Sequence, residues 1–102
     1  METPSGAYVT QEGAMFRIWC KMWKEGHLLK DMTIENAAPV NRTRKVFDAV
    51  EEVCREWDLA KPIWLEANIR DFKMHSKTRF NQDCFAETIP FDFLEIRIIE
   101  ED

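Results

Sequence analysis

The 102-residue sequence has little of several features that would mark a specialised class of protein. Three glycines and four prolines exclude collagen-like and low-complexity chains. No apolar run approaches the roughly 18 residues that a membrane-spanning helix needs. The first fourteen residues lack the basic and apolar regions of a secretory signal, and neither end carries a lipidation motif. The sequence therefore predicts no membrane attachment, with the cytoplasm as the default location.

Cysteines are few, odd in number and widely separated, at Cys20, Cys54 and Cys84. No Cys-x-x-Cys pair is present, which excludes a zinc ribbon and a thioredoxin-like motif. The spacing does not suggest a disulfide framework, so it indicates a reducing compartment.

The formal net charge is -5, from 14 basic and 19 acidic residues. The excess lies at one end, because 1–86 carry thirteen charges of each sign while 87–102 carry six acids against Arg97. Such an acidic end is typical of a solubilising segment. The lack of a basic surplus also argues against a dedicated duplex-DNA binder.

The chain divides into a polar N-terminal stretch and one structured region. Residues 1–14 show no hydrophobic periodicity, which predicts a loose tail, and 15–102 predict a single α+β domain. The sequence leaves open whether the native chain starts at Met1 or Met15.

Two alternating segments predict a β-hairpin. Apolar residues recur at every second position over 16–24, and Glu25-Gly26 suits a tight turn. The segment 27–35 would return, with Leu28, Met32 and Ile34 on one face.

The rest of the chain predicts two helices and a last strand. Asn41 or Thr43 would cap an amphipathic helix that ends near 58–61, with Val46, Val50 and Val53 inside. The segment 63–74 fits both a helix and a strand, but its composition favours a helix. A further helical turn is expected within 79–86, and a strand over 91–99.

The predicted order is therefore β-β-α-α-β. Three strands cannot bury both of their faces, so the two helices should pack on one face of a three-stranded antiparallel sheet. The other face would then be solvated or would form an interface.

Three short segments carry a resemblance: Pro62-Ile63-Trp64-Leu65, Lys77-Thr78-Arg79-Phe80 and 91–96 (Phe-Asp-Phe-Leu-Glu-Ile). With these, the chain from Met15 onward resembles a family of small bacterial proteins of unknown function. The resemblance implies a bacterial, cytoplasmic protein, and it implies no activity and no catalytic residue.

The outer face of the first strand is the most unusual feature of the sequence. Arg17, Trp19, Lys21 and Trp23 would stand in one row of alternating basic and aromatic side chains. Tryptophan and arginine often anchor protein interfaces, and aromatic rings beside cations also stack single-stranded bases. A third interpretation is structural, because the second helix, the tail or a second copy could cover these tryptophans as core.

A second candidate is the basic segment 70–79. It contains Arg70, Lys73, His75, Lys77 and Arg79, which could hold a phosphate or carboxylate with help from nearby hydroxyls. It has no glycine-rich loop, so a P-loop is excluded. The competing interpretation is a solvated helix end whose cations complement the helix dipole.

The sequence gives no catalytic residue, no metal site and no cofactor. His75 and Cys84 lie nine positions apart, but Asp83 and Phe85 beside the thiol would raise its pKa. The scattered histidines and cysteines lack metal-ligand spacing. We therefore expect a non-catalytic interaction module that binds a protein partner or forms a homodimer. The alternative is a binder of single-stranded nucleic acid or of a phosphorylated ligand, through the aromatic strand and residues 70–79.

Overall fold

A computed structural model describes residues 15–101 of the chain, so the predicted tail at 1–14 lies outside the described residues. In chain order the elements are β2 (Phe16–Lys24), β3 (His27–Glu35), α1 (Arg42–Glu56), α2 (Glu66–His75), β4 (Lys77–Asn81), a 3-10 turn η1 (Gln82–Cys84) and β5 (Phe93–Glu101).

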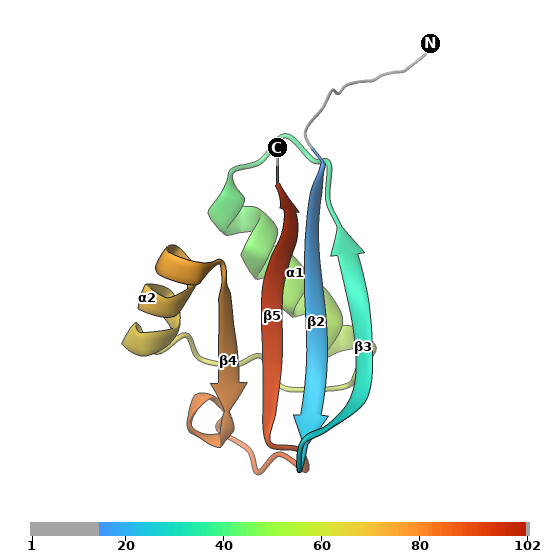
Figure 1. The fold of residues 1–102 in the computed structure, drawn as a ribbon, viewed down its shortest axis with the longest axis vertical. Coiled ribbons are helices and arrows are strands. Elements are labelled where there is room, and N and C mark those ends of the chain that lie inside the picture. The colour runs from blue at the N-terminus through green and yellow to red at the C-terminus, as the bar shows by residue number, and fades with distance from the viewer. Residues whose placement is uncertain (1–14, 102) are drawn as a thin grey trace.

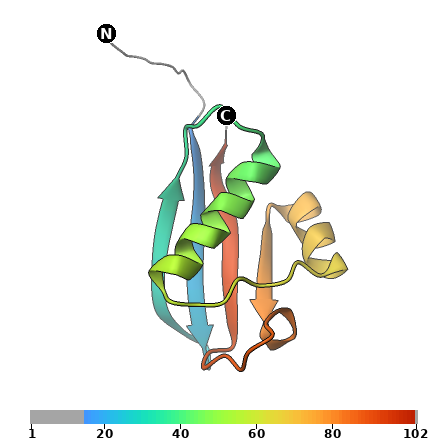
Figure 2. The same ribbon diagram turned by 180° about the vertical axis from the view of Figure 1, so that it is seen from behind.

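The four strands form one antiparallel sheet in the order β3-β2-β5-β4. Figure 1 looks onto one face of this sheet, and Figure 2 shows α1 running obliquely across the other face. The second helix packs beside β4 at the edge of the sheet, and Phe72 of α2 joins the same core as α1. Within residues 15–101, no helix is long and apolar enough to cross a membrane.

The predicted α+β class is confirmed, but the predicted three-stranded sheet is one strand short. The missed strand is β4 (Lys77–Asn81), whose residues 79–81 fall in the segment 79–86 where the sequence analysis expected a turn of helix. Thr78 and Phe80 are buried while Lys77, Arg79 and Asn81 are exposed, so β4 does alternate. Two buried positions are too few to distinguish a strand from a helical turn by period alone. The only helical structure in this segment is the three-residue η1.

The β2–β3 hairpin forms as predicted, with a two-residue turn. Glu25 and Gly26 both have positive φ, at 51° and 78°, which is the backbone of a type I′ turn. The predicted inner face of β2 is also confirmed, because Phe16, Ile18 and Cys20 are fully buried.

A bulge changes the register of the β3 strand. The pairing shifts between Met22 and Trp23, so Leu28 pairs with Trp23 instead of continuing the face of Met32 and Ile34. The prediction that Leu28 shares that inner face is therefore wrong, and Leu28 is exposed. An inserted residue reverses the alternation of every position beyond it, which sequence period cannot anticipate.

The first helix buries the stripe that its sequence predicts, whereas α2 buries Asn68 and Phe72 and leaves Leu65 and Ile69 of its predicted stripe exposed. Asn41 caps α1 by accepting a hydrogen bond from the Arg44 backbone N–H, and Val46, Val50 and Val53 are buried against the sheet. Residues 66–75 are helical, which resolves the ambiguity of that segment.

One aromatic side chain joins the two helices to β4. The Trp64 ring lies 5.4 Å from Phe47 of α1, 5.7 Å from Phe72 of α2 and 4.9 Å from Phe80 of β4, between ring centroids. These tilted and edge-on contacts are the favourable geometries for aromatic pairs. The aromatic cluster therefore sets the position of α2 at the sheet edge.

Candidate functional site

The sheet face opposite α1 is the first candidate site, and we call it the open face. Neither helix covers it, as the view in Figure 1 shows. The strand registers place three cross-strand rows on this face. The rows are Thr33–Trp19–Arg97–Lys77, Asp31–Lys21–Glu95–Arg79 and Leu28–Trp23–Phe93–Asn81.

Three residues of the predicted row, Trp19, Lys21 and Trp23, lie at the centre of the open face, whereas Arg17 lies at the start of β2 and forms ion pairs with Glu35 and Glu100. The Nζ atom of Lys21 is 3.9 Å from the ring centroid of Trp19 and 5.8 Å from that of Trp23. The ammonium group thus makes cation–π contacts with both rings. Trp19 and Trp23 remain half-buried, whereas Lys21 is 8% exposed. The alternative that α2 covers these tryptophans as core is wrong, because α2 lies beside β4.

Two carboxylates hold this row in place. Glu95 is 6% exposed, and its Oε1 atom lies 3.5 Å from Lys21 Nζ. The same oxygen accepts a 2.9 Å hydrogen bond from the Trp23 indole N–H. The Trp19 indole N–H donates to Asp31 Oδ2 at 2.8 Å. Both indole N–H groups are therefore satisfied within the protein, and the rings present apolar surface in fixed orientations.

A group of cations lies at the β4–β5 side of the open face. Lys77 and Arg97 stand directly opposite each other, and the Arg79 guanidinium lies 4.6 Å from the Phe93 ring centroid. Among the described residues, none of these three cations has a carboxylate within 4 Å. Like charges directly opposite each other destabilise a sheet, so this group favours an external anionic partner.

The predicted anion-binding segment is split by the structure. His75, Lys77 and Arg79 lie together along one cleft. Lys73 lines a separate groove beside α1. Arg70 is exposed on α2, two positions from buried Asn68 and Phe72, so it points away from both. The five residues therefore do not form one site, because the helix turns them to different sides.

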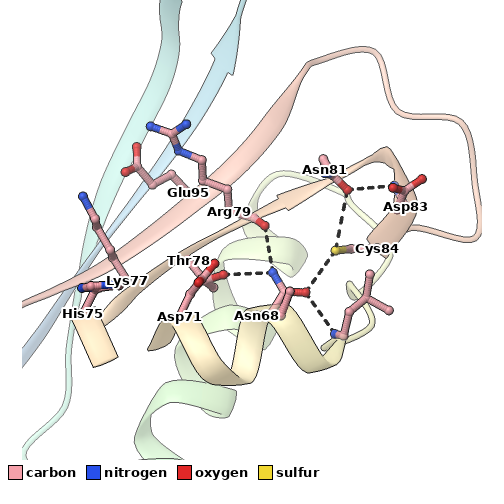
Figure 3. Close-up of a pocket in the computed structure, with 12 residues that line it drawn as sticks. Asn68, Asp71, His75, Lys77, Thr78, Arg79, Asn81, Asp83, Cys84 and Glu95 are labelled. Atoms are coloured by element: carbon pink, nitrogen blue, oxygen red, sulfur yellow. Dashed lines mark hydrogen bonds between the residues drawn. The ribbon is translucent and has the colours of Figure 1, made fainter. Parts of the chain in front are cut away.

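The second candidate site is that cleft, about 550 Å³ in volume, between α2 and the outer edge of β4. Figure 3 shows Asn68 reaching from α2 to β4 at its floor. Its Nδ2 group donates to Thr78 Oγ1 and to the Arg79 carbonyl, both at 2.9 Å. Its Oδ1 atom accepts from the Leu65 backbone N–H at 3.0 Å and from the Cys84 thiol at 3.4 Å. Asn68 therefore uses both ends of its amide to join α2, β4 and η1.

Sequence reasoning missed Asn68. The signal was present, because this polar residue stands four positions before Phe72, on the face that α2 buries. A polar side chain at a core position is expected to have internal partners.

The three thiols are poor nucleophiles. All are buried, and burial raises the pKa of Cys20 to about 12 and that of Cys54 to about 11. Burial also raises the pKa of the Cys84 thiol, in the direction that the sequence predicts. Within residues 15–101, no three histidine, cysteine or acidic side chains are placed to hold a metal ion. The described side chains thus offer surfaces and a cleft for binding.

Comparison with known proteins returned no match of significance among family models, curated proteins or solved structures. The resemblance noted from the sequence stays a prediction.

Proposed function

We propose that this protein is an interaction module that associates with a second copy of itself through the open face. The observation that carries the proposal is the order of side chains in the three cross-strand rows. The charged row is complementary to its own reverse, and so are the two inner positions of each flanking row; a two-fold symmetric dimer needs that property.

A two-fold axis that lies between two facing sheets, parallel to their strands, lays β3 of one copy over β4 of the other. The same axis lays β2 over β5. Each row then faces its own sequence in reverse order. Because sheets twist, two packed sheets are rotated by about 30° from this alignment. Each side chain therefore faces a group of neighbouring side chains of the other copy.

The charged row is the clearest case. Asp31, Lys21, Glu95 and Arg79 alternate negative, positive, negative, positive across the sheet. Reversed, the row places a positive charge over each negative one. Opposite charges facing each other steer association and fix the register of the two copies.

The two flanking rows add aromatic contacts under the same symmetry. Trp19 of one copy would face Arg97 of the other, and Trp23 would face Phe93. The first pair suits a cation–π contact and the second an aromatic stack. Tryptophan and arginine are also the residue types that dominate binding energy in interfaces.

The size of the face sets the expected strength. Three strands about 4.8 Å apart, paired over about eight residues of 3.3 Å each, together with the 5-residue β4 cover about 450 Å² per copy. The dimer would bury about 900 Å² in total, close to the lower limit for a specific interface. We therefore expect a weak, reversible dimer.

Sedimentation equilibrium over 1–200 µM protein tests the proposal. The wild-type chain should pass from monomer to dimer, and Trp19→Ala with Trp23→Ala should stay monomeric with an unchanged circular dichroism spectrum. Ile69→Ala is the control, because this apolar side chain is 44% exposed and lines the groove between α1 and α2, away from the open face. A dimer that survives in the double variant, or dissociates in the control, would refute the proposal.

A charge-exchange series tests the symmetry itself. Asp31→Lys and Arg79→Asp should each weaken the dimer about tenfold. The double variant restores opposite charges across the proposed axis, so its dimer should be stronger than that of either single variant. If the losses of dimer affinity in the two single variants simply add in the double variant, the proposed pairing of Asp31 with Arg79 is wrong.

One observation favours a second candidate, the binding of single-stranded nucleic acid. The unpaired cations Lys77, Arg79 and Arg97 lie beside the aromatic surface of Trp19 and Phe93. Aromatic rings beside cations on a sheet can stack bases while the cations hold phosphates. Fluorescence anisotropy with a labelled dT12 oligonucleotide tests it, because such binding should weaken steeply between 50 and 200 mM salt. No binding at 50 mM salt would exclude this function.

A further inference from the structure

We infer that the groove between α1 and α2 binds a helical segment of a partner protein, which carries leucine-like side chains on one face and acidic side chains beside them. Val46 and Phe47 line the groove from α1, and Ile69 and Phe72 line it from α2. No residue of the three open-face rows takes part, so the groove is a separate site from the proposed dimer interface.

Both helices leave apolar side chains uncovered at this groove. Phe47 of α1 is 48% exposed, and Ile69 of α2 is 44% exposed. Val46 and Phe72, which also line the groove, are buried, so the apolar surface continues from the rim into the core. A continuous apolar surface with a polar rim marks an interaction site, whereas single exposed apolar residues do not.

Contacts between the helices hold the groove open in one shape. The Trp64 ring packs on Phe47 of α1 and on Phe72 of α2, with 5.4 Å and 5.7 Å between the ring centroids. Nearer the start of α1, Arg42 donates a 3.2 Å hydrogen bond to Ser76 Oγ at the end of α2. A groove that is already ordered costs a partner little conformational entropy on binding.

The charged residues that line the groove are both cations, Arg42 and Lys73, and no described acidic residue lines it. Arg42 is paired with Glu101 at 2.9 Å. Lys73 has no carboxylate within 4 Å among residues 15–101. The acids of the adjacent hollow are already neutralised by the ion pairs Arg44–Asp48 and Lys61–Glu51. An acidic side chain of a partner would therefore supply the counter-charge that Lys73 lacks.

The size and the walls of the groove determine the form of the occupant. Its volume of about 160 Å³ is smaller than the roughly 300–1,000 Å³ of small-molecule pockets, and it suits one large apolar side chain. Both walls are helices, whose backbone groups are bonded internally, so an extended segment would gain no main-chain hydrogen bonds here. A helix satisfies its own backbone and can insert an apolar side chain between Phe47 and Ile69.

The test uses the full chain and a helical probe, acetyl-Ser-Pro-Glu-Glu-Leu-Glu-Ala-Leu-Leu-Glu-Glu-Leu-Ala-Glu-Tyr-amide, observed by amide nuclear magnetic resonance. Saturable shifts should concentrate on α1 and α2 around Phe47 and Ile69. The matched peptide with lysine in place of every glutamate should bind at least about tenfold more weakly. The chain has a net charge of -5, so unspecific charge attraction would favour the lysine peptide. Preference for the lysine peptide, or no saturable binding up to about 2 mM, would overturn the inference.

A proline substitution in the probe distinguishes a helical occupant from an extended one. Proline in place of the glutamate that follows Leu-Leu breaks the helix and keeps all four leucines, so it should weaken binding at least about tenfold. Glutamine at the same position removes the same charge and should change binding by about twofold at most. Equal binding by the proline and glutamine peptides would show that the occupant is not a helix.

Two variants of the protein test the walls of the groove. Ile69→Ala should weaken peptide binding about tenfold through lost apolar contact, and Lys73→Glu should do so through charge repulsion. Arg55→Glu is the matched control, because it makes the same change of charge at an exposed position in the last turn of α1, outside the groove. Equal loss in Arg55→Glu and Lys73→Glu would contradict a specific role for the groove.

The open-face variants keep this inference separable from the proposed dimer. Trp19→Ala with Trp23→Ala should still bind the peptide, and Ile69→Ala should still form the dimer. In the double variant without peptide, groove shifts that grow with protein concentration would identify a second copy as the occupant. Shifts of the amides of 1–14 on addition of the peptide would identify the chain's own N-terminal segment. Either result would overturn the inference.

Discussion

Replacing Asn68 with alanine should destabilise the protein, because the Asn68 side chain links α2 to β4. Asn68 is 5% exposed, and it makes three hydrogen bonds of 2.9–3.0 Å, to Leu65, Thr78 and Arg79. Each of these hydrogen bonds contributes about 1 kcal/mol to stability. Loss of the donor to the buried Thr78 hydroxyl costs about 1 kcal/mol more. The free energy of unfolding should therefore fall by about 3–4 kcal/mol.

Urea denaturation followed by tryptophan fluorescence measures this loss. A domain of this size has a slope of about 1 kcal/mol per molar urea, so the midpoint should fall by about 3 M. Arg70→Ala is the matched control on the same helix and should change stability by less than about 0.5 kcal/mol.

A double-mutant cycle with Thr78 isolates the buried hydrogen bond. Thr78→Val alone should cost about 1 kcal/mol, because it leaves one amide hydrogen of Asn68 without an acceptor. The double variant should lose about 1 kcal/mol less stability than the two single variants added together, since neither side chain is then left without its hydrogen-bond partner. If Asn68→Ala costs less than about 1 kcal/mol, the amide does not join these elements and the reasoning fails.

Substitutions at Gly26 and Lys21, and the reactivity of Cys20, test the local geometry. Gly26→Ala should lower the free energy of unfolding by about 1 kcal/mol in thermal or urea unfolding, because φ is 78° at this turn position. The Cys20 thiol should react with a disulfide reagent at pH 8 at least 100-fold more slowly in the folded protein than in urea. Since burial raises its pKa from 9.0 to about 12, unfolding free energy should also fall as the pH rises through that window. Lys21→Met should destabilise the fold by about 2 kcal/mol by leaving the buried Glu95 carboxylate without its cation, and adding Glu95→Gln should recover part of the loss, because glutamine keeps an acceptor for the Trp23 indole. Equal stability of Lys21→Met and wild type in urea would contradict that pairing.

Much of the fold was predictable where the sequence repeats a period over many residues. The alternation of 16–24 and the helical spacing from Val46 to Val53 each bury one continuous face, and both predictions are confirmed. The Glu25-Gly26 turn was predictable because glycine accepts a positive φ. Strand β4 was missed because its two buried residues define no period, and its place in the sheet comes from pairing with β5.

The candidate sites divide in the same way. Sequence period alone placed Arg17, Trp19, Lys21 and Trp23 on one face of a strand, but it could not show whether anything covers that face. The order of the four strands decided that question, because it places β5 and β4 beside this row and both helices elsewhere.

The sequence by itself determined which side chains each element turns to one side, since backbone geometry fixes a period of 2 for strands and 3.6 for helices. Only the tertiary structure decided which elements became neighbours. Lys73 and His75 lie on different sides of α2. Glu95 pairs with Lys21, 74 positions away in the chain, and Asn68 lies against the edge of β4. Contacts between distant segments depend on how the whole core packs, and no local pattern of residues encodes them.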